Sequence, residues 1–83
     1  MNKLILVTQP NCRDCIPAKA ILDDLKIEYD YKNAVDNMDF CGLYGIASTP
    51  TLIEVTGETF KKHPGLANIE TFINDRVFNK VEK

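Results

Sequence analysis

The sequence has no long apolar run and no excess of basic charge. Its opening apolar segment covers only residues 4–7, whereas a secretory signal needs about 7–15 apolar residues and a membrane-spanning helix about 18. We therefore expect neither a signal peptide nor a membrane partner. Ten basic side chains stand against twelve acidic ones, which gives a net charge of −2. Because a phosphate backbone would meet so little positive charge, nucleic acid is not an expected partner.

Cysteine is scarce, tryptophan is absent, and the chain has neither internal repeats nor low-complexity stretches. Three cysteines are an odd number that one chain cannot pair completely, so they do not indicate the disulfide framework of a small secreted protein. With 83 residues, 45% of them apolar, the chain fits one compact domain, 1–83, and is not a disordered tail. We expect a monomer in the cytoplasm, where paired cysteines usually serve redox chemistry or bind a metal.

The spacing of apolar residues predicts seven elements. A continuous apolar run is typical of a strand covered on both faces, alternation of a strand with one exposed face, and a three-to-four spacing of a helix. The predicted order is a strand at 4–7, a helix at 18–25, a strand at 27–31, a helix within 33–45, strands at 51–55 and 59–63, and a helix from 68 onward whose apolar side reaches Val81. This order predicts a mixed α/β sheet whose first two strands run parallel through a right-handed crossover.

Two cysteines lie where the first predicted strand leads into the first predicted helix. Cys12 and Cys15 have a spacing at which a helical turn brings their β-carbons close enough for a disulfide. The free N–H groups and the dipole at a helix start favour a thiolate at Cys12, which Arg13 would stabilise and Asp14 would oppose. Pro17 lacks an N–H and restricts its predecessor, so it predicts an irregular first turn.

The same cysteines allow a second hypothesis, a metal-binding module. Cysteine pairs at this spacing occur in zinc sites, and Cys41 with His63 would complete a set of three sulfurs and one nitrogen. Against zinc, Cys41 and His63 are far apart in the sequence and do not form a second tight ligand pair. Taken alone, Cys41 is most simply a core residue of a short helix, and His63 an exposed residue at a strand end. A third hypothesis is an adaptor domain that keeps the fold without redox activity.

Three features at these distances together resemble the thioredoxin superfamily, and most of all its small glutaredoxins and glutaredoxin-like redoxins. They are Cys12-Arg13-Asp14-Cys15 after the first strand, Thr49-Pro50 before the third, and Gly65 before the last helix. The resemblance covers essentially the whole chain and implies the minimal thioredoxin-like α/β fold, a four-stranded mixed sheet with helices on both faces. It also implies a cis peptide bond at Pro50 beside the cysteines, with the backbone of Thr49 free to pair with an extended substrate.

By the same resemblance the protein is a dithiol–disulfide oxidoreductase that reduces protein disulfides, with no cofactor beyond its own redox-active Cys12–Cys15 disulfide. Cys12 is the implied attacking thiol, and Cys15 the thiol that resolves the mixed disulfide. The substrate-binding residues that the resemblance implies are Arg13, Thr49, Pro50 and Gly65. A thioredoxin-reductase-type flavoenzyme or glutathione is the implied electron source, and ribonucleotide reductase is a narrower expected recipient.

The sequence departs from both of the groups that it resembles. The stretch 64–68 lacks the paired glycine and the carboxylates that glutathione-using glutaredoxins carry there, and residues 8–11, ahead of Cys12, are uncharged. These departures argue against glutathione binding. The Trp-Cys-Gly-Pro-Cys signature of thioredoxin is absent as well, so the chain lies between the two groups.

Overall fold

One four-stranded mixed sheet organises the molecule. The computed structural model describes residues 2–82, and the side chains of residues 3–76. Its elements are β1 (Asn2–Thr8), α1 (Cys15–Asp24), β2 (Asp30–Asn33), α2 (Met38–Tyr44), β3 (Thr51–Thr56), β4 (Thr59–Pro64) and α3 (Leu66–Glu82). The strand order is β2-β1-β3-β4. β1 pairs in parallel with β2 and antiparallel with β3, which pairs antiparallel with β4, so the predicted element order and mixed sheet are confirmed.

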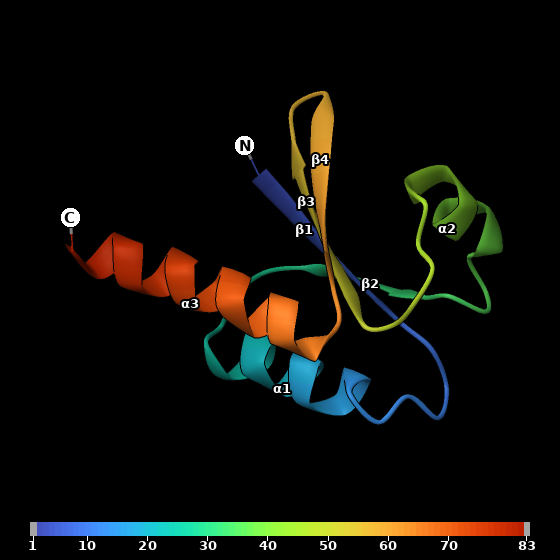
Figure 1. The fold of residues 1–83 in the computed structure, drawn as a ribbon, viewed down its shortest axis with the longest axis horizontal. Coiled ribbons are helices and arrows are strands. Elements are labelled where there is room, and N and C mark those ends of the chain that lie inside the picture. Colours follow the sequence, from blue (N-terminus) through green and yellow to red (C-terminus); the bar gives the residue numbers. More distant parts are fainter. Residues whose placement is uncertain (1, 83) are drawn as a thin grey trace.

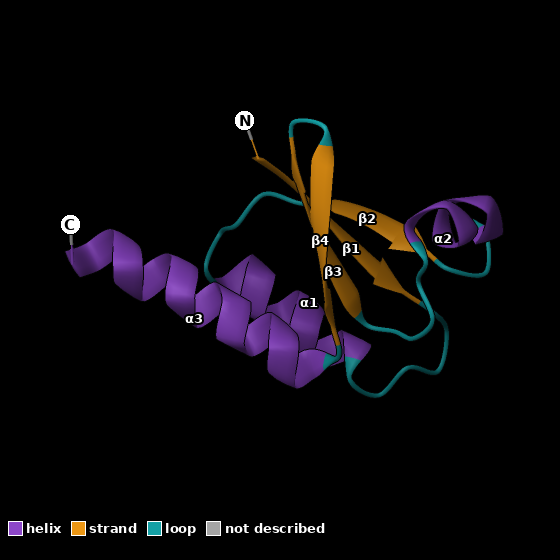
Figure 2. Cartoon of the chain, turned by 45° about the horizontal axis from the view of Figure 1, so that its top comes forward, coloured by secondary structure: helices purple, strands orange, loops and turns teal. Residues whose placement is uncertain are grey.

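Helices cover both faces of the sheet. Figures 1 and 2 show α1 and α3 side by side on one face and α2 alone on the other. The buried side chains on the α1/α3 face are Leu4, Leu6, Ala18, Leu22, Leu52, Ile69 and Ile73. Those on the α2 face are Ile5, Val7 and Ile53. Because β1 sends successive side chains into two different cores, its apolar run is continuous rather than alternating.

Helix α1 begins at Cys15, ahead of the helical apolar spacing that starts at Ala18, and it is α-helical from Cys15 onward. The first hydrogen bond of this helix runs from the N–H of Ala18 to the carbonyl of Asp14 at 3.2 Å. The first four N–H groups of any helix lack an intrahelical acceptor, so Pro17 in this turn removes no bond. The irregular turn expected from Pro17 is therefore absent, and Cys15 has a fixed place at the start of α1.

Strand β2 begins at Asp30, whereas the alternating pattern predicted a strand from residue 27. The reason is the end of α1: Lys26 adopts a positive φ of 55°, and the N–H of Ile27 donates to the carbonyl of Leu22 at 3.0 Å. These residues complete the helix cap before the chain can join the sheet. The alternation still identified the inward side correctly, because Ile27 and Tyr29 pack against the α1/α3 core.

The two remaining helices compare differently with their predicted limits: α2 lies within the predicted range 33–45, whereas α3 starts before residue 68. Helix α2 is confined to Met38–Tyr44 and ends at Gly45, whose φ of 66° is the left-handed conformation that glycine adopts freely. Helix α3 begins at Leu66, directly after Gly65, and Asn68 lies inside its first turn with its side-chain amide donating to the carbonyl of Pro64.

The expected apolar side of α3 beyond residue 76, at Val77, Phe78 and Val81, lies outside the described side chains. Among residues 2–82, no helix combines the length and the apolar character needed to cross a bilayer.

Candidate active site

Cys12 and Cys15 form a disulfide at the carboxyl end of β1. Their Sγ atoms are 2.11 Å apart and their Cα atoms 5.3 Å apart. Cys12 lies in the loop that connects β1 to α1 and is partly exposed, whereas Cys15 is the first residue of α1 and is only 6% exposed. A molecule approaching from solvent therefore reaches the sulfur of Cys12 first.

Two hydrogen-bond donors point at the sulfur of Cys12. The backbone N–H of Cys15 donates to Cys12 Sγ at 3.2 Å, and the hydroxyl of Thr49 donates to the same atom at 3.6 Å. The first donor is one of the N–H groups that a helix start leaves without an intrahelical partner. Because both donors stabilise negative charge, this site favours a thiolate at Cys12 once the disulfide is reduced.

The loop before β3 forms the other side of the site. The peptide bond between Thr49 and Pro50 is cis, and the side chain of Pro50 is fully buried. The N–H of Gly65 donates to the carbonyl of Pro50 at 2.7 Å, and the hydroxyl of Thr51 donates to the carbonyl of Ser48 at 2.7 Å. Among the described residues, the backbone N–H and C=O of Thr49 have no hydrogen-bond partner. The loop is thus held on both sides of Thr49, and the backbone of Thr49 is left unpaired.

Two hollows lie near the cysteines and the Thr49 loop, and Gln9 lines both of them. The first, with a volume of about 520 Å³, is lined by Thr8, Gln9, Asn11, Cys12, Arg13, Cys15, Ile16, Lys19 and Tyr31. The second, of about 360 Å³, is lined by Gln9, Ala34, Met38, Cys41, Gly42, Ile46, Ala47, Ser48 and Thr49. We call the first the Cys12 groove. It is lined by Cys12 together with several polar residues, whereas the second is lined by Cys41 and Thr49 instead.

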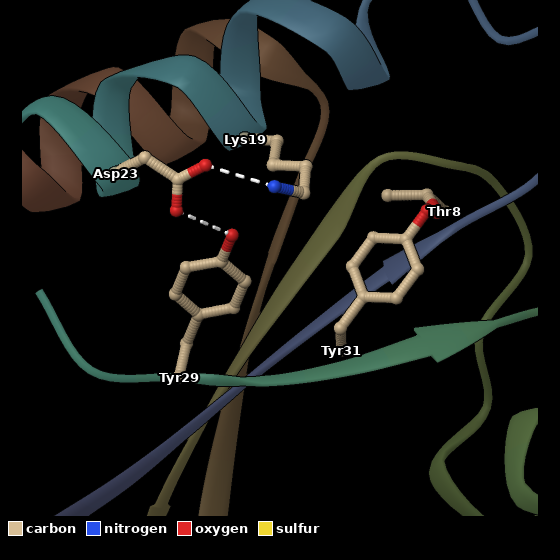
Figure 3. A network of polar contacts seen from close by, with 5 residues as sticks. All are labelled: Thr8, Lys19, Asp23, Tyr29 and Tyr31. Carbon is tan, nitrogen blue, oxygen red and sulfur yellow. Dashed lines mark hydrogen bonds and ion pairs between the residues drawn. The ribbon is translucent and has the colours of Figure 1, made fainter.

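A polar network ties α1 to the segment that enters β2 (Figure 3). Lys19 and Tyr29 both donate to the carboxylate of Asp23, each at 2.8 Å. The hydrogen bond from Lys19, and then that from Tyr29, lower the pKa of Asp23 below its ordinary value. Burial, followed by the hydrogen bond to Asp23, raises the pKa of Tyr29. The network joins α1 to the residue that precedes β2, and Lys19 of this network also lines the Cys12 groove.

The structure brings together most of the residues singled out in the sequence. Cys12 is bonded to Cys15 and accepts a hydrogen bond from Thr49, Gly65 is hydrogen-bonded to Pro50, and Arg13 lines the Cys12 groove.

The ligand set of the metal hypothesis does not assemble. Cys41 packs on the α2 face, as expected for a core residue, whereas His63 stacks on Phe72 of α3, on the other face, with ring centroids 4.3 Å apart. Within the described part of the chain, no three His, Cys, Asp or Glu residues gather as metal ligands. The expectation that His63 is exposed was wrong, because its side chain is only 19% exposed. Its register opposite Leu52 turns it toward the α1/α3 core.

Sequence reasoning missed Tyr31 as a residue of the site. Tyr31 was expected only to help cover the sheet, but it is 53% exposed and lines the Cys12 groove. A usable signal was present, since the carboxyl ends of parallel strands meet at the same edge of a sheet. In the parallel pair of β1 and β2, Tyr31 is in register with Leu6, close to the point where the cysteine loop begins.

No protein-family profile and no curated protein sequence matches this chain. Solved structures do match it. A thioredoxin pre-protein from Schistosoma mansoni is 20% identical, with 89% of this chain and 77% of that chain covered and a TM-score of 0.69. A thioredoxin from Trichomonas vaginalis is also 20% identical, with coverage of 86% and 78% and a TM-score of 0.60. A thioredoxin-like protein is 25% identical over 69% of this chain and 89% of its own, with a TM-score of 0.56. The chain therefore has the thioredoxin fold, in a four-stranded form with a Cys-x-x-Cys disulfide at the start of its first helix.

Proposed function

We propose that the protein is a dithiol–disulfide oxidoreductase that reduces disulfides in protein substrates. The observation that carries this proposal is the environment of Cys12 Sγ. This atom is bonded to a buried partner sulfur, is reachable from an open groove, and accepts hydrogen bonds from the Cys15 N–H and the Thr49 hydroxyl. An attacking sulfur needs both access and a stabilised anion, and Cys12 has both.

The reaction proceeds in two thiol–disulfide exchanges. In the reduced protein, the thiolate of Cys12 attacks one sulfur of the substrate disulfide, and the other substrate sulfur leaves and takes a proton. The thiolate of Cys15 then attacks Cys12 Sγ, which releases the second substrate sulfur as a thiol and forms the Cys12–Cys15 disulfide. Two electrons and two protons pass from the protein to the substrate. Because Cys15 already lies beside Cys12, the second step is intramolecular and has a high effective concentration.

The unpaired backbone of Thr49 supplies the docking element of this proposal. An extended substrate segment can pair with its N–H and C=O, as an added strand pairs with a sheet edge. The hydrogen bond from Gly65 to Pro50 holds the loop so that the paired segment lies next to Cys12. In this proposal Thr49, Pro50 and Gly65 orient the substrate, and Arg13 contacts it from the Cys12 groove.

The cycle requires an external electron donor that returns the disulfide to a dithiol. Our proposal includes a thioredoxin-reductase-type flavoenzyme or glutathione as that donor, ribonucleotide reductase as one recipient, and the reducing cytoplasm as the location. The donors are compared by supplying NADPH with a flavoprotein reductase, or NADPH with glutathione and its reductase, and following NADPH oxidation at a fixed protein concentration. Ribonucleotide reductase is tested as the final acceptor in the same assay.

The proposed activity is tested with insulin and dithiothreitol. We expect the wild-type protein to accelerate reduction and Cys12→Ser to fall to the uncatalysed rate, because it lacks the attacking sulfur. Cys15→Ser is expected to accumulate a mixed disulfide with the substrate, visible by mass spectrometry. Cys41→Ser is the matched control and retains the activity. Full activity in Cys12→Ser would contradict the proposal, and a dithiol that never oxidises in a glutathione buffer would indicate a redox-silent adaptor instead.

A further inference from the structure

The Cys12 groove is rich in hydrogen-bond donors. Five of its lining residues have side chains with hydrogen-bond donors: Gln9, Asn11, Arg13, Lys19 and Tyr31. Among the described residues that line it, there is no aspartate or glutamate. A cavity with this lining is suited to a ligand that carries negative charge and accepts hydrogen bonds.

Arg13 supplies the uncommitted positive charge of this groove. Its side chain makes no ion pair with any other described residue. Lys19 differs, because its ammonium is held by Asp23 at 2.8 Å and is turned toward that carboxylate in Figure 3. A guanidinium binds a carboxylate through two parallel N–H donors, so Arg13 is the stronger candidate for contact with an anionic ligand.

Tyr31 supplies a hydroxyl with a defined position. Thr8 is only 3% exposed, and its hydroxyl donates to Tyr31 Oη at 2.7 Å. Figure 3 shows the hydroxyl of Tyr31 lying against Thr8 at the end of β1. This bond holds the phenol oxygen at one place on the wall of the Cys12 groove, where its rotatable hydroxyl can take part in a hydrogen bond with a ligand. Thr8 is thus a positioning residue that fixes where the Tyr31 hydroxyl lies.

We propose that the Cys12 groove selects protein substrates in which an acidic residue flanks the reducible cysteine. This inference rests on the proposed oxidoreductase function and names its substrate class. The substrate carboxylate accepts hydrogen bonds from Arg13 and Tyr31 while the neighbouring substrate sulfur lies against Cys12. The net charge of the protein is −2, so its overall field disfavours an acidic substrate. A preference for acidic flanks must therefore come from local contacts in the groove.

The test uses three peptide disulfides that are identical except for Glu, Gln or Lys on both sides of the cysteine. We expect kcat/KM to be about tenfold higher for the Glu peptide than for the Lys peptide. Exposed charge contacts are individually weak, so Arg13→Gln and Tyr31→Phe are each expected to lower that ratio by about threefold. Added salt is expected to lower the ratio in the wild-type protein and to change it less in Arg13→Gln.

Two variants serve as matched controls. Arg76→Gln removes one positive charge from an exposed position on α3, and Tyr29→Phe removes a hydroxyl outside the Cys12 groove. Both are expected to keep the wild-type ratio of kcat/KM between the Glu and Lys peptides. A ratio that falls equally in Arg13→Gln and Arg76→Gln would show that net charge, not the groove, sets the preference, and would overturn the proposal.

Further outcomes separate this inference from the function on which it rests. Equal kcat/KM for the three peptides, with insulin still reduced, overturns the substrate class and leaves the oxidoreductase standing. If the protein reduces none of these disulfides, insulin included, both the substrate class and the proposed oxidoreductase function are overturned. A fourth substrate is the mixed disulfide between glutathione and the Gln peptide. It tests whether the carboxylates of glutathione bind to the same donors, Arg13 and Tyr31. If Arg13→Gln slows only that substrate, the groove serves glutathione and the proposal is wrong.

Discussion

The two faces of the sheet differ in how firmly their helices are attached. Helix α1 buries Leu22 completely and shares one core with α3, whereas no side chain of α2 is buried and Leu43 is 78% exposed. The disulfide spans the boundary between α1 and its preceding loop, on the well-packed face. The loop that carries Thr49 follows the lightly packed α2. The site therefore combines one side fixed by the main core with another side that has less apolar support.

The contrast between the faces is tested most directly by one substitution made on each. Leu22→Ala empties a fully buried position of α1 and is expected to lower the free energy of unfolding by about 3 kcal/mol. Leu43→Ala makes the same change at an exposed position of α2 and is expected to alter it by less than about 0.5 kcal/mol. Urea unfolding followed by circular dichroism measures both. Equal losses would show that the two faces contribute alike.

Two of the three glycines with a positive φ provide a comparison of intermediate size. Gly65 precedes α3 with a φ of 84°, and Gly45 ends α2 with a φ of 66°. Either glycine replaced by alanine is expected to cost about 1 kcal/mol of unfolding free energy, because L-residues avoid this conformation. Only Gly65→Ala is expected to alter the alkylation rate of reduced Cys12, since Gly65 is hydrogen-bonded to Pro50. An equal rate change in Gly45→Ala would contradict the separation of the two faces.

A smaller effect is expected at the third cysteine. Cys41 is partly buried on the α2 face, and Cys41→Ala is expected to lower the free energy of unfolding by less than about 1 kcal/mol. Insulin reduction is expected to stay at the wild-type rate, because Cys41 belongs to a different core from the α1/α3 side that holds Cys15. A tenfold loss of activity without loss of stability would make Cys41 part of the redox centre.

The smallest effect concerns the exposed network that joins α1 to β2. The folded-state pKa of Asp23 is lowered, so its contribution to stability is present above the ordinary carboxylate pKa and is lost as the pH falls through the lowered value. Tyr29→Phe removes one of the two donors and is expected to shift that titration upward, toward the ordinary value. Carbon-13 NMR of the Asp23 carboxyl measures the shift. No upward shift would show that Lys19 alone sets this pKa.

The sequence predicted the order of the elements because the spacing of apolar residues reports which side chains are buried. Among the described residues, β1 and β3 have runs of consecutive buried side chains, whereas β2 and β4 do not. The sequence predicted the boundaries less well, because caps depend on single backbone conformations. Pro17 shows this: its missing N–H suggested a broken turn, but the position falls where a helix leaves N–H groups unpaired anyway. Lys26 is the opposite case: its backbone has a positive φ, although lysine as a residue type gives no reason to expect one.

In the candidate site, too, some residues could be predicted from local sequence and others could not. Cys12 and Cys15 could be chosen from spacing alone because their chemistry is local. Tyr31 could not be chosen from its own neighbourhood, since it enters the Cys12 groove only through strand pairing with β1 and through the hydroxyl of Thr8. His63 was misjudged because the strand pattern gave its position along β4 but not the stacking on Phe72 that covers it.

One amide proton links the helix start to the sulfur chemistry. The N–H of Cys15 lies with its nitrogen 3.2 Å from Cys12 Sγ, and Pro17 in the same turn has no N–H to share that role. The nuclear resonance of this proton is therefore expected to differ when the neighbouring sulfur is oxidised, reduced or captured by a substrate. The Cys15 amide proton can thus serve as a spectroscopic probe of the redox state of Cys12 Sγ, without any added label.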